Sequence, residues 1–142
     1  MTTGPITLSR LNRAIAAYLQ QPSLTNVWIV AELMDVRVAR GHCYMELIEK
    51  DATTGTVVAR MRAAIWASVY SGLASRFRKA TGREFATGLK VLVCGTVSYH
   101  PAYGLSLVIN NIDPSFTLGE AERRRREILE QLTRDGIIND NR

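Results

Sequence analysis

The feature that most constrains this chain is the order in which its hydrophobic periodicities follow one another. Three segments that alternate apolar and polar residues come first, at residues 27–38, 42–49 and 56–65, and short turns join them. Alternation with a period of two is typical of half-buried β-strands. The turns are too short for the crossover helices that parallel strands need, so we expect antiparallel neighbours.

The period then changes to that of a helix. The residues that recur at helical spacing are Trp66, Val69, Tyr70, Leu73 and Phe77. This predicts a helix that ends at Gly82. Two more alternating segments follow at 89–99 and 105–112, joined by a loop at 100–104. The sequence does not decide which residues of the last strand point inward, because residues 107–109 are all apolar and a bulge would exchange the two faces.

A short amphipathic helix precedes the first strand. Thr7 is suited to be its N-cap, apolar residues then recur at spacings of three and four up to Leu19, and Pro22 closes the segment. Five strands with a helix between the third and fourth is the order of the OB-fold, a Greek-key barrel whose open face and loops bind oligonucleotides or oligosaccharides. We therefore predict a mainly β fold with flanking helices, its OB domain spanning residues 1–118.

Residues 119–142 form the second predicted unit, with a charged helix over 119–134. Its Glu and Arg residues four positions apart are Glu120 with Arg124, Glu122 with Arg126, and Glu130 with Arg134. Such pairs favour a solvated helix surface over a nucleic-acid patch for the Arg run 123–126. Its apolar stripe consists of Ala121, Ile128, Leu129 and Leu132. A stripe this narrow suits a connector that leads away toward an absent domain.

The positive charge of the chain belongs to its first unit. Lys and Arg number 18 against 13 Asp and Glu, a net charge of +5. From residue 119 onward six Arg balance six acidic residues, so the whole excess lies in residues 1–118. Fifteen of the 18 basic residues are Arg, whose guanidinium group can form two hydrogen bonds to one phosphate and can stack on flat rings. An anionic, planar partner such as nucleic acid fits this surface, and a generic basic surface is the alternative.

Membrane and secreted classes are disfavoured. The longest apolar run, residues 14–19, is far below the roughly 18 residues that span a bilayer, and residues 1–10 hold no hydrophobic signal core. Cys43 and Cys94 stand in alternating apolar segments without metal-ligand spacing, so we expect two buried thiols in a reducing compartment. The prediction is a cytoplasmic protein with no membrane partner.

No constellation of reactive groups indicates catalysis. His42 and His100 have no evident nucleophile partner, and Glu32 and Asp35 stand three apart on a strand, where they face opposite sides. His42 points across the sheet from Cys43, which argues against joint metal ligation. We therefore expect no catalytic residue, metal or cofactor in this chain.

The best binding signal lies on the outward face of the second and third strands. There His42 and Tyr44 are expected near Arg60 and Arg62 of the antiparallel neighbour. Nucleic-acid bases stack on aromatic rings with about 1 to 3 kcal/mol each, while cations meet the phosphates. The alternative is that Tyr44 only covers a strand surface.

Two loops and two tryptophans complete the candidate site. Arg37 and Arg40 in the loop 37–41, with His100 and Tyr103 in the loop 100–104, are predicted to clamp a strand from either side. Trp66 stands where strand turns to helix, and both a binding and a core position are open for it. Trp28 is expected to pack under the first helix.

Several sequence blocks, in order, carry a family resemblance. They are NVWIVAEL, GHCYMELIEKD, ARMRAAIW, VLVCGTVSYHPAYGLSLVINNIDP and RRRREILEQLTRDGIIND. Together they resemble the N-terminal part of the exodeoxyribonuclease VII large subunit, and the likeness covers nearly the whole chain from LSRLNRAI onward. Arg62 matches the family's Arg in the third strand, and His42 and Tyr44 match its GH-x-Y segment.

The resemblance implies an OB-fold that binds single-stranded DNA and delivers it to the complete enzyme for degradation to oligonucleotides. It also implies a catalytic domain and a helical region carrying small subunits, both outside this chain, so these 142 residues alone are expected to be inactive. The chain departs from the family pattern at Ala31, His100 and Leu107, where Gly, Tyr and Gln are frequent.

Two alternatives from other classes remain. An anticodon-binding module of an aminoacyl-tRNA synthetase also places a helix before an OB barrel and reads splayed RNA bases. A protein-interaction OB-fold has no nucleic-acid role at all. Affinities for DNA and RNA oligonucleotides of equal length separate these hypotheses.

Overall fold

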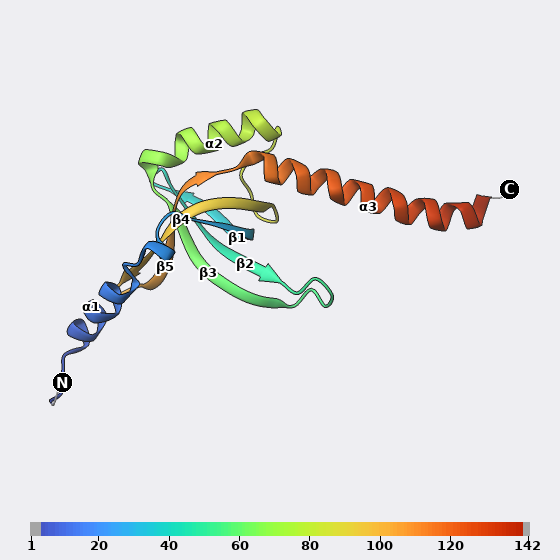
Figure 1. The fold of residues 1–142 in the computed structure, drawn as a ribbon. Helices are drawn as coiled ribbons and strands as arrows, with labels where there is room; N and C mark the ends of the chain where they lie inside the picture. The colour runs from blue at the N-terminus through green and yellow to red at the C-terminus, as the bar shows by residue number, and fades with distance from the viewer. Residues whose placement is uncertain (1–3, 141–142) are drawn as a thin grey trace.

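The structure is a computed structural model that describes residues 4–140, with side chains through Thr133 (Figure 1). In chain order the elements are α1 (Leu8–Leu19), the 3-10 turn η1 (Pro22–Leu24), β1 (Val27–Ala39), β2 (His42–Lys50), β3 (Val57–Ile65), α2 (Ala67–Thr81), β4 (Lys90–His100), β5 (Gly104–Ile112) and α3 (Pro114–Asp140). The strands form a closed barrel in the order β1-β2-β3-β5-β4. This confirms the predicted five-stranded OB-fold and its helix positions.

Barrel closure depends on β1 and on the β3–β5 contact. The first half of β1 pairs with β4, from Val27 opposite Gly95 to Glu32 opposite Lys90, and its second half pairs with β2. Within this second half the β1–β2 register shifts after Met34, where Asp35 adopts a positive φ of 53°. A short parallel contact between β3 and β5 completes the barrel, and the other four pairings are antiparallel.

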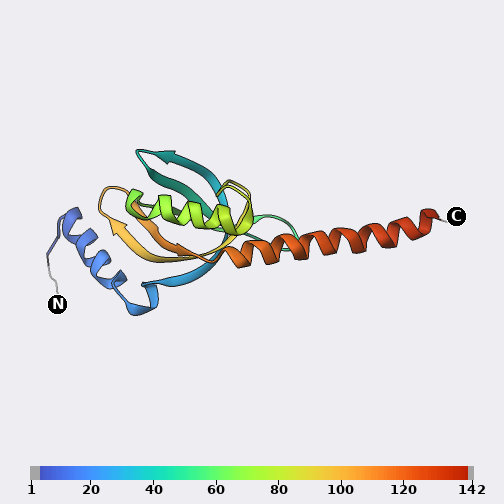
Figure 2. The same cartoon turned by 90° about the horizontal axis from the view of Figure 1, so that it is seen from above.

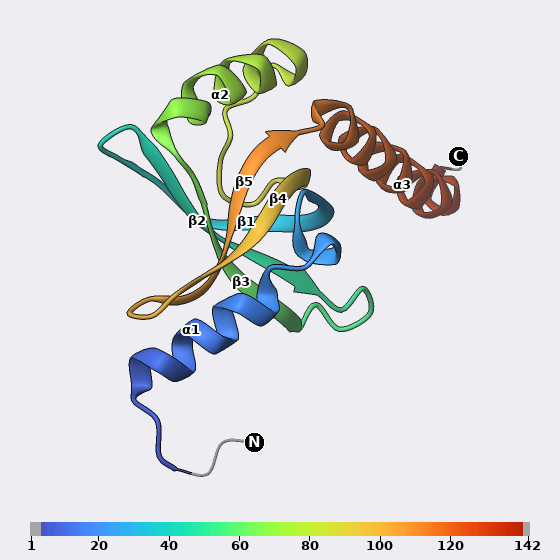
Figure 3. The same ribbon diagram turned by 60° about the vertical axis from the view of Figure 1, so that its left-hand side comes forward.

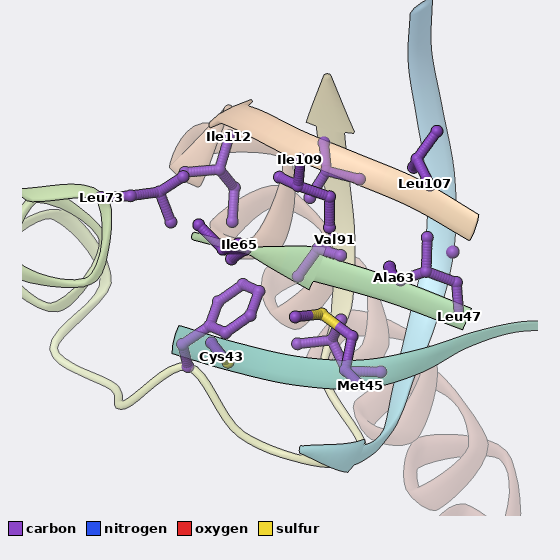
Figure 4. Close-up of a cluster of buried hydrophobic side chains, with 14 of the residues drawn as sticks. Cys43, Met45, Leu47, Ala63, Ile65, Leu73, Val91, Leu107, Ile109 and Ile112 are labelled. Carbon is purple, nitrogen blue, oxygen red and sulfur yellow. The ribbon is translucent and has the colours of Figure 1, made fainter. Parts of the chain in front are cut away.

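Strand alternation places the core as the sequence indicates. Figure 4 shows side chains from β2, β3, β4 and β5 converging inside the barrel. The buried apolar residues of these strands and β1 include Ala31, Leu33, Cys43, Met45, Leu47, Ala63, Ile65, Val91, Val93, Leu107, Ile109 and Ile112. Helix α2 adds Leu73 and Phe77, and the Phe77 ring meets the Phe85 ring edge-on at 5.5 Å. Cys43 and Cys94 are both buried and free, and burial raises the pKa of the Cys43 thiol.

The open question about β5 is settled by a bulge. Cys94 pairs with Asn111, but the next residue, Gly95, pairs with Ile109, so β5 carries one extra residue at this point. The bulge lets Ile109 and Ile112 both point inward although three positions separate them. A Cβ on Gly95 would lie 2.8 Å from the Val108 carbonyl oxygen, so only glycine fits opposite the bulge.

The first helix packs differently from the prediction. Its start is as expected, because the Thr7 side chain accepts a hydrogen bond from the Arg10 backbone N–H. Its barrel contacts, however, are mainly with β4, and Trp28 on β1 remains 50% exposed. The prediction that α1 covers Trp28 is therefore wrong, since an apolar helix stripe does not specify which strand it packs on.

The exit helix begins five residues earlier than predicted. α3 starts at Pro114, and its first turns pack on the barrel, where buried Thr117 donates its hydroxyl to the Lys90 carbonyl at 3.0 Å. Beyond these turns the helix projects away from the barrel (Figure 2). Within the described chain, no helix combines the length and the apolar character needed to cross a membrane.

Ion pairs on α3 form with other partners than predicted. Arg123 bonds Glu120 at 2.9 Å and Glu127 at 2.7 Å, while Arg125 lies 3.5 Å from Glu122. The expected pairs Glu120–Arg124 and Glu122–Arg126 are wrong, because residues three apart on a helix are also neighbours and these closer arginines hold the carboxylates. The pair Glu130–Arg134 lies outside the described side chains.

Candidate nucleic-acid interface

Three aromatic rings gather on the outward side of the barrel where β2 begins and β3 leads into α2. We call His42, Tyr44 and Trp66 the aromatic cluster. The Trp66 ring centroid lies 5.3 Å from that of His42 and 6.2 Å from that of Tyr44, and both pairs meet edge to face. The His42 and Tyr44 centroids are 6.2 Å apart. The cluster brings together three of the predicted site residues.

Strand register explains where Tyr44 stands. It pairs with Arg37 on one side and with the small Ala64 on the other. The guanidinium carbon of Arg37 lies 5.8 Å from the centroid of the Tyr44 ring, within cation–π range. Arg37 thus belongs to β1, which continues to Ala39, and not to a loop as predicted.

His42 is held by the start of α2. Its Nδ1 accepts a hydrogen bond of 2.8 Å from the backbone N–H of Ala67, which leaves the proton of the neutral imidazole on Nε2. Trp66, the N-cap residue of α2, makes no capping bond with its own side chain. Gly41 packs against the same helix start, since a Cβ there would lie 3.2 Å from the Ala67 Cβ. The β1–β2 turn and α2 therefore fix the ring of His42 together.

The sequence left both a surface and a core position open for Trp66, and the structure places it on the surface. Its side chain is 43% exposed, although it directly precedes a helix whose own apolar residues enter the core. An exposed indole presents a large flat surface at a fixed place, because the strand end and the helix start hold its backbone. This arrangement suits stacking by a planar ligand.

The two arginines predicted on β3 differ in their surroundings. Arg60 lies 3.6 Å from the carboxylate of Glu46, and 62% of its side chain is exposed. Arg62 donates a hydrogen bond to the backbone carbonyl of Tyr103 in the β4–β5 turn. Arg62 thereby ties the strand face to that turn, while Arg60 is partly neutralised by an acidic neighbour.

A second pair of rings lies at the β4–β5 turn, where His100 is the last residue of β4, not part of a loop as predicted, and Tyr103 stands in the turn itself. The His100 and Tyr103 centroids are 4.6 Å apart with planes inclined by 30°, close to a stacked arrangement. His100 Nδ1 accepts a hydrogen bond of 3.0 Å from the Ala102 backbone N–H, and the Tyr103 side chain is 71% exposed. The turn therefore presents an ordered aromatic surface next to Arg62.

Arg40 stands apart from these groups. It occupies the β1–β2 turn with a positive φ of 57°, is exposed, and forms no ion pair with any residue whose side chain the structure describes. The predicted residues thus form two groups, the aromatic cluster with Arg37 and the turn residues with Arg62. Arg40 and Arg60 lie at their margins.

Some supporting residues were not identified from the sequence. The ion pair of Glu46 with Arg60 was not identified, although strand alternation places Glu46 on the outward face with His42 and Tyr44. The roles of Ala67 and Gly41 in holding His42 depend on a contact between separate elements, which no local pattern contains. Among the described residues, no three His, Cys, Asp or Glu side chains gather in a way that would hold a metal ion.

The chain is similar in sequence to a known protein family and to a known enzyme subunit. Residues 6–113 match the family described as OB-fold nucleic acid binding domain. The chain is 38% identical over 120 residues to the exodeoxyribonuclease 7 large subunit of Deinococcus radiodurans, which confirms the resemblance read from the sequence. That alignment covers 82% of this chain and 29% of the relative, so the chain spans less than a third of that protein.

Two solved structures are similar to this chain at lower sequence identity. One is a putative aspartyl-tRNA synthetase from Leishmania major Friedlin, with a TM-score of 0.43 and 19% identity over 68% of this chain and 19% of that one. Another is the mitochondrial single-stranded DNA binding protein Rim1 from S. cerevisiae, with a TM-score of 0.41 and 11% identity over 63% of this chain and 92% of that one. The closed five-stranded barrel and the family match agree, and the chain belongs to the family of OB-fold nucleic acid binding domains.

Proposed function

We propose that this chain is the single-stranded DNA binding domain of an exodeoxyribonuclease VII large subunit, and that it holds the strand for degradation by the complete enzyme. The observation that carries the proposal is the aromatic cluster, in which Trp66 is exposed and His42 and Tyr44 are half-buried, with Arg37 over the Tyr44 ring. The 38% identity to a large subunit supports the choice of enzyme.

Single strands fit this surface better than duplexes. In a duplex the bases stack on one another, whereas the bases of a single strand are free to stack on Tyr44 and Trp66. Arg37 stands beside the Tyr44 ring and Arg62 beside the β4–β5 turn, and both are assigned here to the phosphates that connect stacked bases. Stacking supplies sequence-tolerant affinity, and the arginines add a term that salt weakens.

Binding without cleavage is the second part of the proposal. Glu46, two residues after Tyr44 on the same strand, has its carboxylate in an ion pair with Arg60. We assign DNA binding to residues 1–118 and a connecting role to residues 119–142, since α3 leaves the barrel beyond its first turns (Figure 2). Cleavage and the small subunits then belong to other parts of the enzyme.

The test measures binding and degradation side by side. Fluorescence anisotropy with DNA and RNA oligonucleotides of equal length should give tighter DNA binding, with a Kd on the order of 10⁻⁴ to 10⁻⁶ M at physiological salt. The same mixtures, run on a denaturing gel, should show intact DNA. Preference for RNA would favour the anticodon-binding alternative, absence of binding at low salt would favour a protein-interaction module, and released nucleotides would contradict binding without cleavage.

A further inference from the structure

Helix α1 carries positive charge that forms no ion pair within the described part of the chain. Arg10 and Arg13 lie on it, and residues 4–31 contain no acidic residue, the first being Glu32. Both arginines are exposed, and neither forms an ion pair with a described residue. By contrast, Arg123 of α3 binds two carboxylates. The two arginines of α1 are free to bind an anion.

The packing of α1 directs this charge toward solvent. Asn12 is its buried residue, and Ile15 and Leu19 on the same side are partly buried. At 100° per residue, Arg13 is displaced by about 100° and Arg10 by about 160° from Asn12 around the helix axis. The basic side of α1 therefore lies away from the barrel.

The place of α1 in the fold links it to the candidate interface. In Figures 1, 2 and 3, α1, the β1–β2 turn, the start of α2 and the β4–β5 turn all lie at one end of the barrel, and α3 leaves from the other. α1 packs mainly on β4, the strand that leads into the His100–Tyr103 turn. In Figure 3 the β4–β5 turn lies between the β1–β2 turn and α1. A strand that crosses the aromatic cluster and then this turn arrives at α1.

We propose that α1 is a second phosphate-binding element, in which Arg10 and Arg13 hold the backbone of single-stranded DNA after it passes the β4–β5 turn. The inference rests on the proposed function and adds α1 to the DNA-binding surface that it assigns. Because α1 lies beyond the β4–β5 turn as seen from the β1–β2 turn (Figure 3), a strand must exceed the length that fills the cluster before it gains this contact. The helix thus distinguishes long from short single strands.

The experiment compares two double variants on two DNA lengths. Arg10→Gln/Arg13→Gln removes the α1 charges, and Arg124→Gln/Arg126→Gln removes two arginines from the exposed part of α3, neither of which has an ion pair within the described chain. Both variants lower the net charge equally, and Gln is nearly as good a helix former as Arg. Binding of oligothymidylates of about 8 and about 24 nucleotides, one within and one beyond the usual OB-fold site sizes of about 4 to 16 nucleotides, is titrated over salt.

The α1 variant should lose affinity for the long oligonucleotide only. Two lost phosphate contacts reduce the slope of log K against log salt by about 1.4, and the α3 variant should match the unsubstituted chain on both lengths. Arg10→Lys/Arg13→Lys, which keeps the charge, should restore most of the affinity. Thermal unfolding of each variant shows whether its fold is intact.

Distinct outcomes separate this inference from the function on which it rests. If the unsubstituted chain binds neither oligonucleotide, the proposed function fails and the inference fails with it. If it binds both, but the α1 variant loses nothing, loses equally on both lengths, or loses no more than the α3 variant, then the inference is overturned and DNA binding by the barrel stands.

Discussion

The Nδ1 atom of His42 accepts a hydrogen bond of 2.8 Å from the backbone N–H of Ala67, 25 residues along the chain. The first N–H groups of a helix have no partner within it, and here a ring from β2 takes the place of a capping side chain. The bond joins the strand that carries Tyr44 to the residue that follows Trp66. It therefore couples stability of the helix start to placement of the cluster.

Replacing His42 tests this coupling. His42→Ala should lower the free energy of unfolding by about 1 kcal/mol, as loss of a helix cap does, and should weaken DNA binding as well. Urea denaturation measures the first effect and anisotropy the second. His100→Ala is the matched control, because His100 accepts its bond in an exposed turn, and its stability should change by less than about 0.5 kcal/mol. Equal losses of stability in both variants would contradict a capping role.

Tyr44 should contribute through stacking alone. Tyr44→Ala is expected to weaken single-stranded DNA binding by about 1 to 3 kcal/mol without altering the salt dependence, because a ring carries no charge. Tyr44→Phe keeps the ring and should bind as the unsubstituted chain does. Titrations at several salt concentrations check both statements, and a changed slope in Tyr44→Ala would show that the ring acts by positioning Arg37.

Arg62 should contribute through charge. Arg62→Ala is expected to reduce the slope of log K against log salt by about 0.7, the value of one phosphate contact on a single strand. Arg62→Lys retains the charge and should restore that slope. If Arg62→Ala weakens binding with an unchanged slope, its effect comes from the lost bond to Tyr103 and the turn it holds.

The sequence predicted the candidate site where strand alternation decides it. Placement of Tyr44 and Arg62 outward, with Met45 and Ala63 inward, follows from a period of two and holds in the structure. The bond between Arg62 and Tyr103 was not predictable, because it depends on β3 and β5 lying side by side. The parallel β3–β5 pairing has no local sequence signal.

Helix surroundings were predicted less well than strands. The N-cap Thr7 and the terminal Gly82 were identified because local chemistry defines helix ends. The strand that α1 packs on and the start of α3 at Pro114 depend on tertiary contacts with β4. In the sequence such contacts are visible only as a stripe of apolar residues, and the stripe does not indicate which strand the helix packs against.

Gly95 should tolerate no side chain. In Gly95→Ala the new Cβ would lie 2.8 Å from both the Leu107 Cγ and the Val108 carbonyl oxygen, so the β5 bulge must shift. Overpacking of this kind costs about 1 to 3 kcal/mol. Gly72→Ala is the control, since a Cβ there meets nothing within 4 Å, and in a helix it should stabilise by about 0.5 to 1 kcal/mol. Chemical denaturation of both variants checks the opposite signs.

Glu120 should make the stability depend on acid pH. Hydrogen bonding from Arg123 lowers the pKa of this carboxyl below its usual value. Its stabilising contribution is therefore complete above the unfolded pKa, near 4.3, and disappears as pH falls through the lower folded value. Glu120→Gln should reduce stability at about pH 7 by up to about 1 kcal/mol, with no difference remaining at about pH 2.

The control for Glu120 is Glu49→Gln, because Glu49 is exposed and has no ion pair with the residues described. Thermal unfolding across the acid range compares the two variants. A Glu120→Gln difference that persists below the folded pKa would show that the side chain acts through packing on α3 and not through its charge.

The pairing of β1 with both β2 and β4 has a kinetic consequence. The β1–β2 and β2–β3 hairpins need only short loops to close, but Val27 must find Gly95, far along the chain, before the barrel exists. Bringing such distant residues together costs loop-closure entropy, and contacts between the strands offset this cost only after they have formed. Folding of this domain should therefore be limited by the return of β4 to β1, on the millisecond-to-second scale of barrels rich in non-local contacts.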